Sequence, residues 1–333
     1  MCFLPRPHPM NWSPFKSLPW DIYVVSWELF KVMIPTLLVV KLFDMAGGVE
    51  ALAWAMGPAM QVIGLPDDAS IVLTTIMLTN VYAGFIIMAG MESLSNITSA
   101  QATSMAIFLL IAHGLPVECM ITRRAGVRLR VMVPFRIVTA FLAAGLVHWI
   151  ASPLGVMQEP APIQLPSMDA EPTLVGWLID QALGLVFIQV IIIVLLAFLA
   201  LLKVIGVERL IKLALTPFLR LLGIGSDAST IAVVGITLGI SFGGGLMIKE
   251  VDRGQIPQRD IFLVVMLMGL LHSIIEDTSI AMLLGPSLII ILIGRVVFSI
   301  MVMLLVKWLV FGRSEVFWRR YLVNERAMPA TTP

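Results

Sequence analysis

The stretch GLPDDAS at residues 64–70 recurs as GIGSDAS at residues 223–229. The same shift of 159 residues (272 − 113) aligns residues 45–150 with residues 204–309 without a gap and superimposes His113 on His272. A register held over about a hundred residues indicates an internal repeat, and in membrane proteins two copies of one unit usually place a binding site between them.

The composition indicates a membrane protein. Hydrophobic residues make up 59% of the chain and charged residues 13%, with a mean hydropathy of +0.98. Soluble domains average about 25% charged residues, and several apolar stretches here approach the ~20 residues that span a bilayer. The net charge of +1 gives no reason to expect a nucleic-acid partner. We therefore expect an all-α polytopic protein whose surroundings are a lipid bilayer.

Each repeat is predicted to hold about three transmembrane helices, an amphipathic helix and a glycine-interrupted apolar stretch. The predicted segments are 22–43, 48–63, 68–91, 102–124 and 129–151 in the first half, and 181–202, 207–222, 227–249, 261–284 and 288–310 in the second. The chain then divides into a cytoplasmic N-terminal segment (1–21), repeat 1 (22–151), an extracytoplasmic Pro-rich linker (152–180), repeat 2 (181–310) and a basic cytoplasmic tail (311–333).

Basic residues predict that the two repeats are inverted relative to each other. Four arginines between residues 123 and 130 belong on the cytoplasmic side, whereas the matching residues 284–287 carry no basic residue. The basic run 203–220 also belongs inside, whereas its counterpart 44–68 carries only acidic charges. We expect a multi-pass protein of the cell (inner) membrane with both termini in the cytoplasm.

Inversion requires an odd number of crossings in each half, so one stretch must enter and leave on the same side. Treating 68–91 and 227–249 as re-entrant hairpins satisfies the charge rule at both places. Non-helical backbone at that depth is tolerated where it faces protein or a water-filled cavity, which makes the tips candidate solute-binding elements. The tip residues singled out are Asn80, Tyr82, Gly84, Gly239, Ser241, Gly243 and Gly244. The alternative is that these glycines only allow helices to pack closely.

Titratable residues lie near the middle of two predicted helices. His113 is followed by Glu118, and His272 by Glu276 and Asp277. Ionisable groups inside a membrane are costly and usually functional. They could relay protons, coordinate a cation or hydrogen-bond a polar solute, or the histidines could simply be satisfied by neighbouring polar groups.

Two further features surround these residues. Pro116 is expected to kink the helix just beyond His113. Arg136 and Arg295 are expected to form structural ion pairs with Glu118 and Asp277, because buried arginine is normally paired.

At these residues the chain resembles the Gate family, whose members are labelled "nucleoside recognition domain" proteins. The resemblance rests on the doubled Gly-x-x-x-Asp-Ala-Ser segment, the glycine-broken hairpin and the stretch from His113 to Glu118 followed by two arginines, and it covers residues 22–310. The family is similar in organisation to the membrane domain of FeoB-type ferrous iron transporters and to concentrative nucleoside transporters. The resemblance implies paired hairpins that hold a substrate near the bilayer midplane. The cysteine that precedes the proline in the FeoB pattern is missing here, since Cys119 follows Pro116.

The first functional hypothesis is a secondary transporter of a small polar solute, nucleoside-like by the family label, with a proton or sodium as a possible coupling ion and no other cofactor. The second is a divalent-metal permease that uses His113, Glu118, His272 and Glu276. The third is a non-transporting membrane sensor or assembly partner, and association of several copies of the chain stays open. An enzyme is not expected, because P-loop, GxSxG, HExxH and CxxC motifs are absent from the sequence.

Overall fold

The structure is a computed structural model that describes most of both halves. It covers residues 13–89, 91–165, 173–205, 217–225, 228–229, 231–232, 235–236, 239–240, 248, 251–254, 256–274 and 276–324. Ser241, Gly243 and Gly244 lie outside the described residues, as do the side chains of Tyr82 and Glu276.

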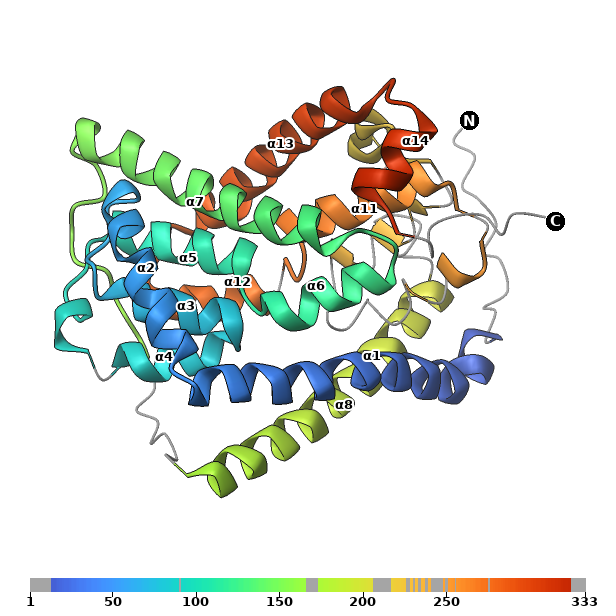
Figure 1. Cartoon of the computed structure of the whole chain (residues 1–333), viewed down its shortest axis with the longest axis horizontal. Coiled ribbons are helices and arrows are strands. Elements are labelled where there is room, and N and C mark those ends of the chain that lie inside the picture. The colour runs from blue at the N-terminus through green and yellow to red at the C-terminus, as the bar shows by residue number, and fades with distance from the viewer. Residues whose placement is uncertain are drawn as a thin grey trace, which may run out of the picture.

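The described residues form helices and no strand, which confirms the all-α prediction (Figure 1). The first half contains α1 (Ser13–Met45), α2 (Gly48–Val62), α3 (Ala69–Leu78), α4 (Val81–Ala89), the short η1 (Glu92–Leu94), α5 (Ser99–Ala112), α6 (Leu115–Arg124) and α7 (Leu129–Leu154). The second contains α8 (Leu174–Ile205), α11 (Gln258–Leu270), α12 (Glu276–Ala281), η2 (Met282–Leu284), η3 (Ile290–Gly294), α13 (Arg295–Val310), α14 (Glu315–Phe317) and η4 (Trp318–Leu322).

Three described stretches are long and apolar enough to cross a membrane. They are the interrupted pair α5–α6 (Ser99–Arg124), α7 (Leu129–Leu154) and η3–α13 (Ile290–Val310). Within an apolar window of 18 residues, the α5–α6 stretch is 83% buried inside the protein, against 28% for η3–α13. The first therefore forms the centre of the molecule, whereas the second presents much of its apolar surface outward.

The predicted stretch 68–91 is a helical hairpin, with a break at Thr79–Asn80 between α3 and α4. Asn80 Oδ1 accepts the Ala83 amide at 2.9 Å, which satisfies an otherwise free donor at the start of α4. A Cβ on Gly84 would lie 3.1 Å from the Val72 carbonyl oxygen. Twelve residues of straight helix would span about 18 Å, so α4 must fold back along α3. Gly84 lies between the two arms and not at the tip, because the arms approach each other closely there.

The helices predicted at 102–124 and 261–284 are both interrupted; a kink was expected beyond His113 in the first, whereas the interruption of the second was not expected. The first breaks between α5 and α6 at His113–Gly114, and the second between α11 and α12. Gly114 has φ +53° and the matching Ser273 has φ +44°, a left-handed conformation that ends a helix. Pro116 does not kink a continuing helix. It is the second residue of α6, where its missing N–H removes no hydrogen bond.

Local geometry repeats at the 159-residue shift. Gly64 and Gly223 both have positive φ, at +72° and +81°. The Leu65 amide donates to Met60 O, and the matching Ile224 amide donates to Leu219 O, both at 2.9 Å. A Cβ on Gly64 would meet His148, and one on Gly223 would meet Lys307, the residue that matches His148. The two helix-ending turns therefore have the same conformation and face the same position of the last long helix in their half.

Candidate functional site

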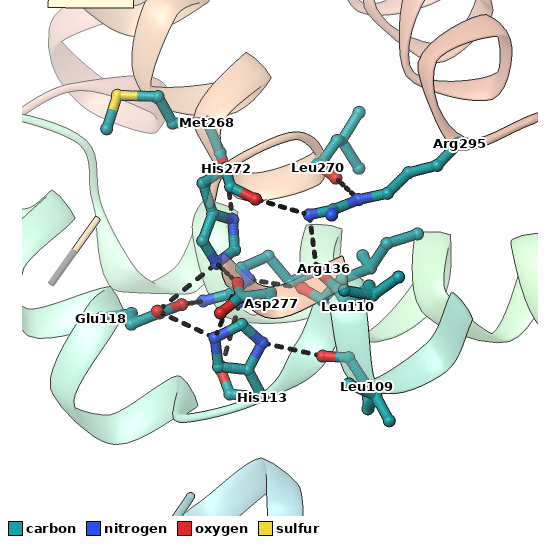
Figure 2. Close-up of polar contacts among 11 residues, drawn as sticks. Leu109, Leu110, His113, Glu118, Arg136, Met268, Leu270, His272, Asp277 and Arg295 are labelled. Carbon is teal, nitrogen blue, oxygen red and sulfur yellow. Dashed lines mark hydrogen bonds and ion pairs between the residues drawn. The ribbon is translucent and has the colours of Figure 1, made fainter. Parts of the chain in front are cut away.

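The helix breaks bring four titratable side chains from the two halves into one buried cluster (Figure 2). His113 lies at the end of α5, Glu118 in α6, His272 just after α11 and Asp277 in α12. The two imidazole rings face each other with centroids 5.0 Å apart. Glu118 Oε1 lies 3.3 Å from His113 Nε2 and 3.4 Å from His272 Nε2. Asp277 Oδ2 lies 3.6 Å and 3.8 Å from the same two nitrogens. Each histidine therefore contacts both carboxylates.

The other nitrogen of each ring is bonded to the backbone of its own helix. His113 Nδ1 lies 2.8 Å from Leu109 O, and His272 Nδ1 lies 2.7 Å from Met268 O. A carbonyl oxygen can only accept, so each Nδ1 must carry the proton of that bond. In the neutral tautomer this leaves a lone pair on each Nε2.

Two buried arginines satisfy the carbonyl groups that the helix breaks leave free. Arg136 Nε donates to Ile111 O at 2.7 Å and its Nη2 to His113 O at 3.2 Å. Arg295 Nε donates to Leu270 O at 2.8 Å and its Nη2 to His272 O at 3.1 Å. These contacts correspond at the 159-residue shift. The last carbonyls of a helix lack intrahelical partners, so the arginines serve as side-chain caps for α5 and α11.

The arginines differ in their contacts with the carboxylates. Arg136 Nη1 lies 2.5 Å from Glu118 Oε2, so the expected contact between these two residues is present. Arg295 has no carboxylate oxygen within 4.0 Å among the described residues, and the predicted ion pair with Asp277 is absent there. Its Nη2 reaches instead across to the first half and donates to Leu110 O at 2.7 Å. Arg295 therefore binds a third carbonyl through Nη2, whereas its Nη1, the atom through which Arg136 contacts Glu118, has no hydrogen-bond partner among the described residues.

Several buried polar atoms of the cluster lack a hydrogen-bond partner. Among the described residues, these include His272 Nε2, Asp277 Oδ2, Thr278 Oγ1 and Arg295 Nη1. Buried polar groups are nearly always paired, and two of these atoms face each other at 3.8 Å. A lone pair on Nε2 would face another lone pair on the carboxylate, so the contact becomes attractive once a proton or a cation lies between them.

The α3–α4 hairpin touches this cluster at the helix break. The Gly114 amide donates to Ile76 O at 3.0 Å, and in the second half the Ile274 amide donates to Ile236 O at 3.0 Å. Gly239, with φ +84°, lies against Ser273, because a Cβ at Gly239 would meet the Ser273 hydroxyl. Asn80 is exposed and bonded within its own turn, and Gly84 is buried between the hairpin arms. Of the predicted tip residues, Gly239 thus lies beside the helix break, whereas Asn80 and Gly84 serve the hairpin itself.

Sequence reasoning missed Gly114 and Ser273, whose left-handed backbone turns the chain at the cluster. A signal was present, since Gly114 directly precedes the Leu-Pro pair that opens α6, and glycine before proline favours a turn. The matching residues Ser273, Ile274 and Ile275 contain neither glycine nor proline, so the second break left no local signal.

The comparisons with known proteins support a membrane protein without naming an activity. The chain is 28% identical over 271 residues to an uncharacterized membrane protein, YvoD, of Bacillus subtilis (strain 168). The match covers 79% of this chain and 84% of that relative. No family model matches the chain, and no solved structure does. Together with its membrane-length helices, this similarity defines the chain as an all-helical membrane protein.

Proposed function

We propose that the protein is a secondary transporter of a small polar solute, built from two inverted repeats, in which the cluster of His113, Glu118, His272 and Asp277 binds the coupling proton. The observation that carries the proposal is the placement of both Nε2 atoms, each within 4 Å of both carboxylates. The two Nδ1 atoms are held by the backbone, so the Nε2 atoms are the positions at which the cluster gains or loses a proton.

Contacts at the two ends of the molecule support the inverted arrangement. The linker binds the start of α5 at one end, where Ser99 N donates to Glu159 O, and the residues after η2 lie beside it. The C-terminal segment binds the α6–α7 turn at the other end, where Asn324 N donates to Gly126 O (Figure 1). A shift of 159 residues relates the linker to the C-terminal segment, and it relates the α6–α7 turn to the residues after η2. Equivalent parts of the two repeats therefore lie at opposite ends, as inversion requires.

Contacts across the centre support a two-fold relation between the halves. Arg295 of the second half reaches Leu110 of the first. Reciprocally, Arg136 of the first half packs against Gly269, the residue that matches Leu110, since a Cβ there would lie 3.5 Å from Arg136 Cγ. Reciprocal contacts between matching residues are the property of an interface on a two-fold axis. The two histidines then meet at the axis, where movement of one half against the other would separate them.

Charge favours a proton over a divalent ion as the species bound. Counting the described side chains, the two arginines balance Glu118 and Asp277, so the cluster is neutral when both imidazoles are neutral. One proton raises its charge to +1, and a divalent cation would raise it to +2. Because uncompensated charge inside a membrane is costly, the proton is the smaller perturbation. The proposed solute site adjoins this cluster at the hairpins, and the resemblance to the Gate family makes nucleoside-like compounds the first solutes to test.

The second candidate function, a divalent-metal permease, is favoured by one observation. Ligand atoms of His113, His272 and Asp277 all lie within 4.8 Å of one another, a spacing that a small contraction would bring to metal coordination. The positive charge of the two arginines counts against a metal permease, whereas the two imidazoles count for it because they supply metal-ligating nitrogens.

The test uses purified protein in liposomes that carry a pH-sensitive dye inside. Nucleosides, nucleobases and, separately, Mn²⁺ or Fe²⁺ are added outside with and without an imposed pH gradient. Solute uptake that follows the gradient, and that is lost in the H113Q/H272Q double variant, is the expected result. The matched control is His148→Gln, which changes a histidine of α7 outside the cluster.

The alternatives give different outcomes. Uptake that survives loss of both cluster histidines would refute the coupling role. Metal uptake without proton movement would establish the permease. A protein that moves none of these probes, and that instead copurifies with a stoichiometric membrane partner, would support the sensor or assembly hypothesis and count against transport.

A further inference from the structure

Two matching segments close the two ends of the molecule. The linker strap, residues 156–165, follows α7, and the tail strap, residues 315–324, follows α13. A shift of 159 residues converts one into the other. Each strap lies partly on its own half and partly on the opposite half, so each one joins the halves at one end.

The tail strap is held by side-chain and backbone hydrogen bonds. On its own half, Trp318 packs edge-on against Phe262 with ring centroids 5.2 Å apart and is only 2% exposed. On the opposite half, Arg128 donates to the strap three times: its amide to Leu322 O at 3.0 Å, its Nε to Val323 O at 2.7 Å and its Nη2 to Arg319 O at 2.7 Å. Arg128 is therefore the principal anchor that joins this strap to the first half.

The same pattern recurs at the linker strap with different chemistry. On its own half, Ser99 N donates to Glu159 O at 2.8 Å and Ala100 N to Met157 O at 2.9 Å. On the opposite half, Gln164 N donates to Leu283 O at 2.8 Å, and Pro162 packs on Gly285, which has no side chain to obstruct it. A backbone hydrogen bond and a proline contact hold this strap to the opposite half, since Ser287 occupies the position that matches Arg128 and offers no arginine side chain.

We infer that the two straps are the access gates of the transporter: release of the tail strap admits solvent to the central cluster from that end, and release of the linker strap admits it from the other. The inference rests on the proposed function, since gates matter only if the cluster must meet both faces. With both straps bound, His272 is 0% exposed and Glu118 3%, which describes a closed state. A half cannot move away from its partner at one end while the strap there bridges them, so opening requires that strap to release.

A native cysteine reports on this opening without knowledge of the solute. Cys119 follows Glu118 in the chain and is 1% exposed. The experiment labels full-length protein, in a Cys2→Ser background, with a membrane-impermeant maleimide in vesicles of each orientation, and measures modification of Cys119 by mass spectrometry.

Arg128→Gln removes the two hydrogen bonds that the Arg128 side chain donates to the tail strap. We expect Cys119 labelling from the tail face to rise about tenfold or more, with no rise from the linker face. Arg123→Gln is the matched control. It removes the same charge from the same loop, but its side chain is exposed and only its carbonyl contacts the strap, through Asn324 Nδ2 at 2.5 Å.

Disulfide locks test the reverse effect and do not depend on the stability of the arginine variant. Val127 pairs with Val323 and Thr98 with Pro160 as isolated bridges, so each pair replaced by cysteines can close one strap. Oxidation of the V127C/V323C variant should suppress tail-face labelling of Cys119 at least tenfold, with recovery on reduction. Oxidation of the T98C/P160C variant should leave tail-face labelling unchanged.

The possible failures are distinct. Equal labelling in the Arg128 and Arg123 variants, or tail-face labelling that persists under the V127C/V323C lock, would overturn the gate assignment and leave the transport proposal standing. Labelling of Cys119 from both faces in one locked protein would overturn the gates as well. If the straps respond as expected but the H113Q/H272Q variant still transports, the coupling role alone is overturned.

Discussion

Replacement of Arg295 by leucine tests how strongly the buried arginines hold the broken helices together. Arg295 is 1% exposed and donates to the carbonyls of Leu270, Leu110 and His272. Leucine fills similar space but donates nothing, so three buried acceptors lose their partner. Each unsatisfied buried acceptor costs about 1–3 kcal/mol, and partial relaxation of the helix end reduces the sum. We expect a loss of roughly 4 kcal/mol in the free energy of unfolding, which is far above the typical effect of about 1 kcal/mol for a single substitution.

The measurement is a thermal melt of detergent-purified protein in which a thiol-reactive dye reports exposure of Cys119, in the Cys2→Ser background. A loss of this size corresponds to a midpoint lower by about 6 °C for a chain of this length. Arg295→Lys should recover part of the lost stability. The lysine ammonium group keeps the positive charge and donates hydrogen bonds, but it lacks the planar arrangement of donors of the guanidinium. Arg123→Leu, at an exposed position, is the control. A midpoint for the Arg295→Leu variant within about 2 °C of that control would mean that the carbonyls find other partners, and the capping role would be wrong.

Other substitutions give graded results in the same melt. Glu118→Gln should lower the midpoint more than Asp277→Asn, because Glu118 holds an ion pair with a buried arginine and Asp277 does not; equal effects would argue against that asymmetry. Gly84→Val should separate the arms of the α3–α4 hairpin and destabilise by about 1–3 kcal/mol, whereas Gly57→Ala, with open space around it in α2, should be neutral or stabilising by up to about 1 kcal/mol. Ser273→Gly should stabilise by about 1 kcal/mol by relieving a left-handed conformation, and a destabilised variant would show that the serine side chain matters more than the backbone strain.

Sequence reasoning reached the helical class, the hairpin at 68–91 and the pairing of Arg136 with Glu118, because each left a chemical trace. Apolar length predicts membrane helices, the distribution of basic residues with an odd number of crossings predicts the hairpin, and a buried arginine is normally paired with a carboxylate. These sequence signals were either local or based on general rules about which groups a membrane tolerates.

The break between α11 and α12 and the contacts of Arg295 could not be read from the sequence. Ser273 adopts φ +44° without a glycine or proline nearby, because the fold around it determines the backbone there. The choice of Arg295 between Asp277 and three carbonyls depends on distances across the two halves. Repeat symmetry predicted matching carboxylate partners for the two arginines, and the second half departs from it: Arg295 binds Leu110 O across the halves and leaves Nη1 without a partner among the described residues.

The arrangement also links the proposed gates to the charge of the cluster. His113 and Glu118 belong to one half and His272 and Asp277 to the other, so two of the four contacts that hold a proton, His113–Asp277 and His272–Glu118, exist only while the halves are together. A strap that releases lets the halves part and weakens these contacts. If opening lowers the proton affinity of the cluster by some factor, thermodynamic linkage requires that protonation lowers the equilibrium constant for opening by the same factor. Under the proposed function, a protonated cluster therefore favours bound straps and an unprotonated cluster favours their release. Each histidine contacts carboxylates of both halves, so the proposed effect extends to both ends.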